Sequence, residues 1–270
     1  MVTEKKIREL GNSKLPFYDE YELGKVELFT IPSGDGIELP ARWILPADFD
    51  NAKKYPVLFK VYGGPGRNSV TNTFPRLSDM YYAQEGIIII YVDHRGSGHF
   101  GKEGMSLMHR NLGKWEMHDY IAAVKWLKEK SFIDTSKIGI TGGSYGGYVT
   151  SLALTQGSDY FTHGIAQFSV TDWLLYDNVY TERYMDKPED NPEGYKAGSV
   201  FTYVDNYKGM LRLTHGTMDD NVHMQNTIQL IDKLIDANKE FELMIYPGER
   251  HGVRGVKRKH ATRETNSFWF

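Results

Sequence analysis

The chain has 270 residues, no cysteine, 40% hydrophobic residues and a formal net charge of −3 at neutral pH. The absence of cysteine excludes disulfides, thiolate metal sites and a cysteine nucleophile, and the nearly balanced charge gives no strong bias toward nucleic acid or anionic membranes. No apolar run approaches the length of a membrane-spanning helix, and the charged start MVTEKKIREL lacks the apolar core of a signal peptide.

The first predicted elements form an antiparallel hairpin, because two extended runs within residues 25–45 flank the turn Ser33–Gly36. Later apolar runs have the length of strands. They cover residues 56–64, 86–92, 137–144, 164–170, 211–216 and 241–248. Strands that are apolar on both faces belong in a parallel sheet covered by helices.

Two intervening segments, residues 118–130 and 223–239, carry apolar residues at helical spacing. The expected buried faces consist of Tyr120, Ile121, Val124 and Leu127 in the first helix, and Ile228, Ile231, Leu234 and Ile235 in the second. Asn238 is expected to end the second helix. Strands alternating with helices predict an α/β domain with a mostly parallel twisted sheet and helices on both faces. Residues 1–24 are expected to be a leading arm or linker, and residues 25–270 the domain.

The predicted strands end in glycine and polar residues. These ends are Tyr62–Gly64, Asp93–Gly96, Gly143–Ser144, Thr171–Trp173, His215–Thr217 and Pro247–Glu249. Open parallel sheets bind ligands at the carboxyl ends of their strands. The sequence therefore predicts a functional site at this edge of the sheet.

The segment Gly142–Gly146 reads GGSYG and fits the pattern G-x-S-x-G between a predicted strand and a predicted helix. That context is required for a nucleophile elbow, in which a tight turn lifts a serine to the top of the sheet. The flanking positions need glycine because the turn leaves no room for side chains. The alternative is a glycine-rich turn with an incidental serine, but the strand and helix around Ser144 favour catalysis.

A serine nucleophile needs a base, and the base needs an orienting carboxylate. His251 is the only downstream histidine that follows a predicted strand in a glycine-containing loop. His215 ends a strand but precedes the acid candidates, against the expected chain order of Ser, Asp and His. His163, expected to precede a strand, and His223 fit surface or packing positions, and His260 lies in a basic run.

The acid candidates are Asp219 and Asp220, which follow the predicted strand 211–216. Position alone favours Asp219 only slightly. Adjacent aspartates also serve as helix N-caps, and Asp220 fits that role.

An oxyanion hole would complete the chemistry. One donor is expected to be the backbone N–H of Tyr145, which follows the serine. The second is expected from the loop after residues 56–64, as a backbone amide or the Tyr62 hydroxyl. The alternative for Tyr62 is an aromatic ring packed at a strand end.

Taken together, the motifs resemble the dipeptidyl peptidase IV branch of the prolyl oligopeptidase family of serine peptidases. They are YPVL with VYGGPG, DHRGSG, GGSYGGYVTS, VTDWLLYDNVYTERYM, and HGTMDDNVH with ERHG, in this order between residues 53 and 251. The resemblance implies an α/β-hydrolase fold and a triad of Ser144, Asp219 and His251. It also implies the Tyr62 hydroxyl and the Tyr145 amide as oxyanion donors, and an acyl-enzyme mechanism that needs no metal or cofactor.

The resemblance also gives the aromatic stretch a function. It implies a small apolar S1 pocket for proline formed by Val170, Trp173, Tyr176 and Tyr180, with Asn221 and Val222 near the substrate. Flat aromatic walls suit a compact pyrrolidine ring. The alternative is an aromatic helix face buried in the core.

The family places a β-propeller before this domain, and no propeller-length sequence is present here. The chain is therefore expected to be a separated catalytic domain of a serine peptidase that cleaves peptides after proline and releases dipeptides or tripeptides. The propeller is its expected missing partner, and a homodimer through the C-terminal helix is a further expectation. Export to the periplasm or cell surface is a further implication. Rival hypotheses are an esterase or acylaminoacyl-releasing hydrolase, a non-catalytic interaction domain, and binding of an acidic partner by the basic run 250–263.

Overall fold

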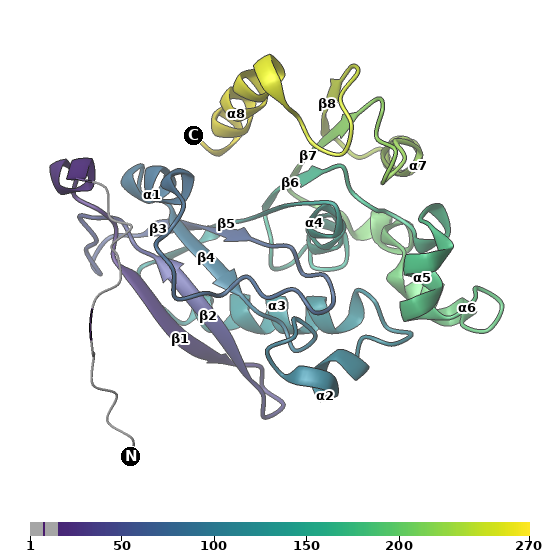
Figure 1. The fold of residues 1–270 in the computed structure, drawn as a ribbon, viewed down its shortest axis with the longest axis horizontal. Coiled ribbons are helices and arrows are strands. Elements are labelled where there is room, and N and C mark those ends of the chain that lie inside the picture. Colours follow the sequence, from purple (N-terminus) through teal and green to yellow (C-terminus); the bar gives the residue numbers. More distant parts are fainter. Residues whose placement is uncertain (1–7, 9–15) are drawn as a thin grey trace.

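The computed structural model describes Arg8 and residues 16–270, so the predicted leading arm, residues 1–24, lies mostly outside the described residues. The described part of the arm contains the short 3₁₀ helix η1 (Pro16–Glu20), where the ring of Tyr18 contacts Phe74 at 4.8 Å between centroids. The rest of the chain forms one sheet with helices around it (Figure 1).

The sheet has eight strands in the order β1-β2-β4-β3-β5-β6-β7-β8. The pairs β1–β2 and β2–β4 are antiparallel, and every later pair is parallel, as the sequence predicts. The strands are β1 (Val26–Pro32), β2 (Glu38–Ile44), β3 (Tyr55–Lys60), β4 (Ile88–Val92), β5 (Ile133–Gly143), β6 (His163–Gln167), β7 (Met210–Gly216) and β8 (Glu242–Tyr246).

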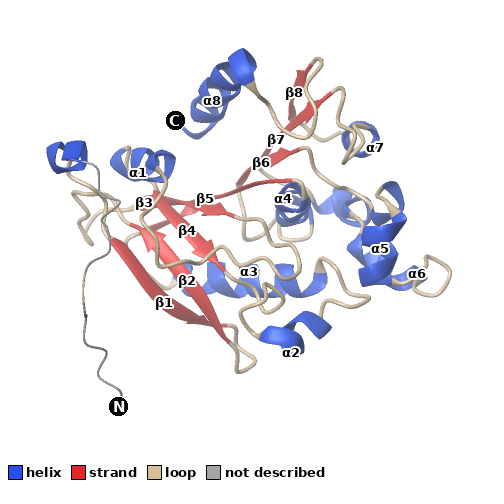
Figure 2. Ribbon diagram, in the orientation of Figure 1, coloured by secondary structure: helices blue, strands red, loops and turns tan. Residues whose placement is uncertain are grey.

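Helices occupy the connections and lie on both sides of the sheet (Figure 2). They are α1 (Leu77–Gln84), α2 (Gly101–Ser106), α3 (Lys114–Lys128), α4 (Tyr145–Thr155), α5 (Asn178–Met185), α6 (Pro192–Gly198), α7 (Gln225–Asp236) and α8 (Gly255–Trp269). Two further 3₁₀ helices are η2 (Trp173–Leu175) and η3 (Val200–Asn206).

The central strands are buried on both faces, which explains their continuous apolar sequences. In β3, Val57 and Phe59 belong to the core under α3 and α4, whereas Leu58 between them belongs to the core under α1. Trp269 of α8 packs against that second core. The alternation of side chains along a strand therefore divides the apolar residues between two layers of helices.

The predicted buried face of α7 is correct for Leu234, which is buried, and for Ile231, which is partly buried, but it is wrong for the other two isoleucines. Ile228 and Ile235 are 48% and 63% exposed, while the polar Asn226 and Thr227 are buried. The Asn226 side chain accepts a hydrogen bond from Thr171 N at 3.0 Å, and the Thr227 hydroxyl bonds the His215 ring at 2.7 Å. Buried polar groups are tolerated when hydrogen-bonded, so these contacts turn α7 away from the face that its apolar spacing predicts.

Several boundaries also differ from the predictions. Strand β6 includes His163, which was expected to precede it, and ends at Gln167, because Phe168 adopts a left-handed φ of 37°. Helix α3 begins at Lys114, several residues before the predicted start. Asn238, expected to end the helix that became α7, has a left-handed φ of 52°, which suits a helix terminus.

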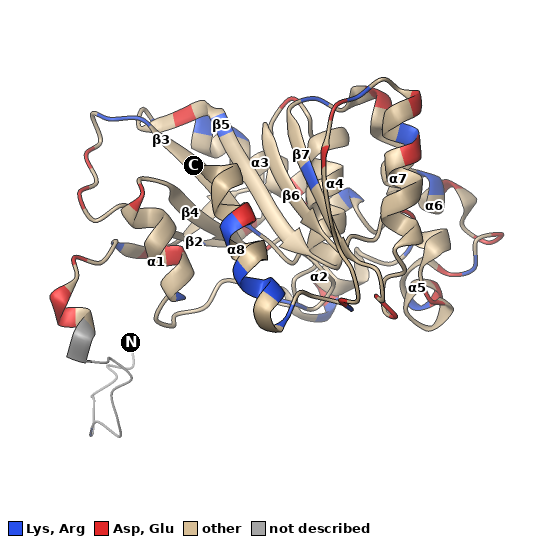
Figure 3. Cartoon of the chain, turned by 90° about the horizontal axis from the view of Figure 1, so that it is seen from above, with Lys and Arg blue, Asp and Glu red and all other residues tan. Residues whose placement is uncertain are grey.

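Charged residues of both signs lie mainly on the outer helices and loops, and the central strands carry few of them (Figure 3). Two residues of the basic run 250–263 form ion pairs within the domain, Lys257 with Glu249 and His260 with Glu264. These carboxylates balance part of the positive charge of the run. Over Arg8 and residues 16–270, no helix combines the length and apolar character needed to cross a bilayer.

Candidate active site

Ser144 occupies a strained turn between β5 and α4. Its backbone has φ 60° and ψ −120°, a conformation that side-chain-bearing residues rarely adopt. The Ser144 N–H donates to the Gln167 carbonyl at 2.9 Å, and its carbonyl accepts from Tyr148 N at 3.0 Å. This strand–turn–helix geometry has the form of a nucleophile elbow.

Two glycines make the turn possible. A Cβ atom at Gly142 would lie 2.4 Å from the Val61 carbonyl oxygen, and one at Gly146 would lie 2.5 Å from the same atom. Both distances are too short for any side chain, so the elbow presses directly against the backbone that follows β3. The prediction that the turn excludes side chains at these positions is confirmed.

Asp219 and His251 come together from the loops after β7 and β8. The His251 Nδ1 and the Asp219 Oδ2 lie 2.8 Å apart. The other carboxylate oxygen accepts hydrogen bonds from Asn221 N and Val222 N, both at 3.0 Å. Asp219 is buried, so its carboxylate is held in one orientation with an oxygen directed at the imidazole.

The neighbouring Asp220 lies in a different environment. Its side chain is 64% exposed and forms an ion pair with the exposed Arg250. The two aspartates, which sequence position hardly distinguished, therefore differ in burial and in partner. The catalytic role of Asp219 stays a prediction.

His215 also contacts Asp219, with its Nε2 atom 3.3 Å from the same Oδ2 that faces His251. The same nitrogen is 2.8 Å from the Val222 carbonyl, and Nδ1 is 2.7 Å from the Thr227 hydroxyl. Burial lowers the pKa of His215, which favours a neutral ring that donates from Nε2 to the carbonyl. His215 therefore supports the Asp219 loop, a role that its position four residues earlier could have suggested.

Phe168 is a second residue that sequence analysis missed. Its ring meets the His251 imidazole edge-on at 4.7 Å between centroids. Its ring also lies 2.5 Å from the position a Cβ would take at Gly143. Phe168 thus contacts both the His251 imidazole, in the loop after β8, and Gly143, at the end of β5. These two ends of the sheet therefore lie close together.

Two groups are suited to donate hydrogen bonds to an oxyanion. Tyr145 is the first residue of α4, so its backbone N–H has no intrahelical acceptor. The Tyr62 ring lies 6.1 Å from the Tyr145 ring, and its side chain is partly exposed. Burial raises the pKa of Tyr62, so its hydroxyl keeps the proton that a donor requires.

The loop that carries Tyr62 is fixed by the loop after β4. The Asp93 carboxylate accepts from Ser69 N at 2.6 Å and from Val70 N at 3.2 Å. Gly66 N donates to the Gly96 carbonyl at 2.9 Å. The loop after β3 therefore depends for its shape on the segment Asp93–Gly96.

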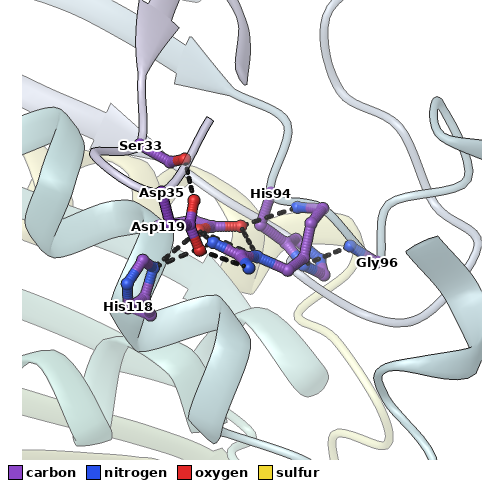
Figure 4. Close-up of polar contacts among 7 residues, drawn as sticks. Ser33, Asp35, His94, Gly96, His118 and Asp119 are labelled. Carbon is purple, nitrogen blue, oxygen red and sulfur yellow. Dashed lines mark hydrogen bonds and ion pairs between the residues drawn. The ribbon is translucent and has the colours of Figure 1, made fainter. Parts of the chain in front are cut away.

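That segment is anchored in turn by the buried Arg95. Its guanidinium donates to the Asp119 carboxylate of α3 at distances from 2.6 to 3.1 Å and to Asp35 of the β1–β2 turn at 2.8 Å. Figure 4 shows Asp35, His118 and Asp119 gathered around this point. The ion pairs join the hairpin, α3 and the loop after β4 into one rigid support.

Glu116 is a buried carboxyl directly beneath the elbow. The Tyr145 hydroxyl donates to its Oε1, and Gly113 N lies 3.0 Å from both carboxyl oxygens. Burial raises the pKa of Glu116 to about 7. Sequence analysis missed this residue, because a single glutamate in an amphipathic helix is usually exposed.

Protonation of Glu116 should make stability depend on pH. The folded pKa of Glu116, about 7, exceeds the reference value of 4.5. The contribution of the protonated carboxyl to the free energy of unfolding is therefore fully present below pH 4.5 and is lost as pH rises through 7. Relative to Glu116→Gln, the free energy of unfolding of the wild type should fall by up to about 3 kcal/mol over this interval. Urea unfolding at intervals from pH 4.5 to 8 measures it.

The exposed Glu129, at the end of the same helix, provides the control. Glu129→Gln should follow the wild-type pH profile. Parallel profiles for the wild type and Glu116→Gln would show that Glu116 does not titrate in this range.

The predicted S1 residues cluster beside Tyr145. Trp173 and Tyr180 are nearly parallel, with ring planes at 18° and centroids 6.1 Å apart, and Tyr176 meets Tyr180 edge-on at 5.4 Å. The Trp173 ring contacts Tyr145 at 5.4 Å. Trp173 and Val170 are buried, whereas the rings of Tyr176 and Tyr180 are partly exposed. The tyrosines are thus the members of this cluster that a ligand can reach.

Asn221 and Val222 differ in exposure. Asn221 is exposed, and its side-chain oxygen accepts from the Tyr176 hydroxyl at 2.7 Å, which links the Asp219 loop to the aromatic cluster. Val222 is 0% exposed, and its backbone joins Asp219 to His215. Within the described residues, no group of three or more histidines and acids is arranged to hold a metal ion.

Comparisons with known proteins agree with this architecture. The sequence model of the prolyl oligopeptidase family matches residues 74–270. Human "Prolyl endopeptidase FAP" is 41% identical over 255 residues, covering 93% of this chain and 32% of that protein. "Probable dipeptidyl-aminopeptidase B" of Arthroderma benhamiae is 39% identical over 92% of this chain and 27% of its own length. The crystal structure of Porphyromonas gingivalis dipeptidyl peptidase 4 matches with a TM-score of 0.89 and 37% identity, over 93% of this chain and 36% of that chain.

The chain spans about a third of the length of these curated relatives. The matched segment 74–270 includes the elbow serine, Asp219 and His251. The predicted α/β-hydrolase fold is confirmed, and so is the resemblance on which it rested. The chain belongs to the prolyl oligopeptidase family.

Proposed function

We propose that residues 25–270 form the catalytic domain of a serine peptidase that cleaves peptides after proline. The observation that carries this proposal is the hydrogen bond between Asp219 and His251, at the sheet edge where Ser144 occupies its strained turn. A strained serine and an oriented imidazole at one edge of the sheet form the arrangement that activates an alcohol for acyl transfer.

In the proposed mechanism, His251 accepts the Ser144 proton as the hydroxyl oxygen attacks the scissile carbonyl carbon. The carbonyl oxygen becomes negatively charged and accepts hydrogen bonds from the Tyr145 amide and the Tyr62 hydroxyl. His251 then donates its proton to the leaving nitrogen, and the acyl-enzyme forms. Water, deprotonated by His251, hydrolyses the acyl-enzyme, and Asp219 stabilises the imidazolium in both steps.

Proline specificity is assigned to the aromatic cluster around Trp173. The partly exposed Tyr176 and Tyr180 offer flat walls for a pyrrolidine ring, with Val170 and Trp173 behind them. The names of the relatives describe a prolyl endopeptidase and a dipeptidyl-aminopeptidase. We extend cleavage after proline to this chain, with release of dipeptides as the preferred mode and a β-propeller supplied by a longer polypeptide as the partner.

The assay that tests this function compares Gly-Pro and Ala-Pro anilides with p-nitrophenyl esters. Because the chain spans about a third of its curated relatives, the assay uses the complete gene product. Turnover of the proline anilides supports the peptidase. Turnover of esters alone would assign the site to the rival esterase, and no turnover of either would support a non-catalytic interaction domain.

Removal of one pocket wall should affect proline substrates selectively. We expect Tyr180→Ala to lower kcat/KM for a Gly-Pro anilide by about 10- to 100-fold and that for p-nitrophenyl acetate by less than about threefold. The acetyl group of the ester is too small to contact the Tyr180 ring, so loss of that ring should have little effect on its hydrolysis. Steady-state kinetics on both substrates measures the difference.

Tyr203→Ala is the matched control, since Tyr203 of η3 is also partly buried and its hydroxyl donates to the Ala197 carbonyl at 3.0 Å. It should leave the ratio of the two activities unchanged. Equal losses on anilide and ester in Tyr180→Ala would remove Tyr180 from the pocket.

A further inference from the structure

A pocket of about 550 Å³ lies beside Tyr62 and is separate from the aromatic cluster. Its walls come from the end of β2, the loop between β3 and α1, the first turn of α1, and β4. Val170, Trp173, Tyr176 and Tyr180 are not among its lining residues. Tyr62 lines this pocket, and its ring also faces Tyr145, which contacts the aromatic cluster through Trp173.

The pocket contains a buried arginine whose guanidinium has few hydrogen-bond partners. Arg42 is 4% exposed, and its Nη1 donates to the Thr71 carbonyl at 2.9 Å. Within the part of the chain that the structure describes, its Nε and Nη2 have no hydrogen-bond partner and Arg42 forms no ion pair. A buried guanidinium without a counter-charge is unfavourable, and an anion in the pocket would relieve that cost.

Two further cations stand at the exposed rim, Arg67 and Arg76. Among the described residues, the lining contains one carboxylate, Asp79. It already pairs with Lys60 and accepts a hydrogen bond from the Tyr91 hydroxyl at 2.7 Å. The pocket as a whole is therefore positive. Arg67 is close enough to Tyr62 to oppose the rise in the phenol pKa that burial causes, which places a rim cation next to the proposed oxyanion donor.

We propose that this pocket is a carboxylate-binding subsite for the leaving segment of the substrate, anchored by Arg42 with Arg76 at the rim. The inference rests on the proposed function. If Tyr62 holds the scissile carbonyl oxygen and the aromatic cluster holds proline, the leaving segment extends past Tyr62 on its other side. A guanidinium binds a carboxylate through two parallel hydrogen bonds. The Nε and Nη2 of Arg42 have no partner but are covered from solvent, so this contact requires the pocket lining to shift when the carboxylate binds.

The carboxylate can come from an acidic side chain or from the end of a short peptide, and two substrate pairs separate these sources. Gly-Pro-Ala as free acid and as amide tests the terminal carboxylate. Gly-Pro-Ala-Glu-amide and Gly-Pro-Ala-Gln-amide test the side chain. Release of Gly-Pro by the complete gene product gives kcat/KM for each, and we expect the acidic member of at least one pair to be favoured by about tenfold.

Arg42→Gln and Arg76→Gln should each reduce that ratio toward one. Lys125→Gln is the control, since Lys125 is an exposed cation on α3, under the other face of the sheet, and should leave the ratio unchanged. If Arg42→Gln fails to fold, the exposed Arg76 still decides the test.

A wild-type ratio near one for both pairs would overturn the subsite, as would an unchanged ratio in both arginine variants. A preference for Glu-Pro over Gln-Pro anilide with no preference in the leaving segment would place the carboxylate on the acyl side and would also overturn it. Gly-Pro anilide has no peptide leaving segment, so its turnover tests the proposed function alone.

Discussion

Ser144→Ala should abolish covalent labelling by a fluorophosphonate probe and lower kcat for a Gly-Pro anilide by roughly 10⁴- to 10⁶-fold. The reason is local: the hydroxyl is the atom that forms the acyl bond, and alanine keeps the backbone of the elbow. Labelling followed by gel fluorescence and by peptide mass mapping measures the first effect, and anilide hydrolysis measures the second. Both use the complete gene product.

Ser136→Ala provides the control, because Ser136 is an exposed serine within β5, whose far end leads into the elbow. It should label and turn over substrate as the wild type does. Persistent labelling of Ser144→Ala would mean that another residue is the nucleophile, and the proposed mechanism would fail with it.

The site is predictable from sequence wherever local chain geometry specifies it. Glycines at 142 and 146 are required by contact with the Val61 carbonyl, so the motif states a physical constraint that any such elbow must meet. The carboxyl ends of parallel strands meet at one edge of a sheet, so the order of strands and loops is enough to assign residues 144, 219 and 251 to one region. The antiparallel hairpin is likewise predictable from the residues of its turn.

Other features depend on contacts between distant segments, and no spacing rule reveals them. The buried face of α7 includes Asn226, which accepts from Thr171 N, and Thr227, which bonds the His215 ring. The helix is therefore turned so that Ile228 and Ile235 are exposed. Glu116 is buried where the Tyr145 hydroxyl of α4 donates a hydrogen bond to it. A helix read alone gives no sign of either effect.

The partners of a buried arginine are a further feature that sequence does not predict, as Arg42 and Arg95 show. Arg95 is buried with Asp119 and Asp35 as partners, so its charge supports the loop after β4. Arg42 is buried without a carboxylate partner among the described residues. A buried arginine is equally unexpected in both cases, and only the tertiary environment separates an arginine held in ion pairs from one with unpaired nitrogens.

Asp219→Asn should lower kcat for a Gly-Pro anilide by roughly 10⁴-fold while the protein stays folded. The asparagine oxygen can still accept from Asn221 N and Val222 N, which leaves its NH₂ group facing His251. The His251 Nδ1 must then accept rather than donate, so the ring proton moves to Nε2. In that tautomer Nε2 carries the proton and has no free lone pair with which to remove the serine proton.

Asp220→Asn is the matched control, since it makes the same chemical change one residue along the chain. Asp220 is exposed and pairs only with the exposed Arg250 among the described residues, so its kcat should fall less than about twofold. Unfolding midpoints of both variants, compared with the wild type, show whether each loss is chemical or structural. A large loss in Asp220→Asn with near-normal activity in Asp219→Asn would reverse the assignment of the acid.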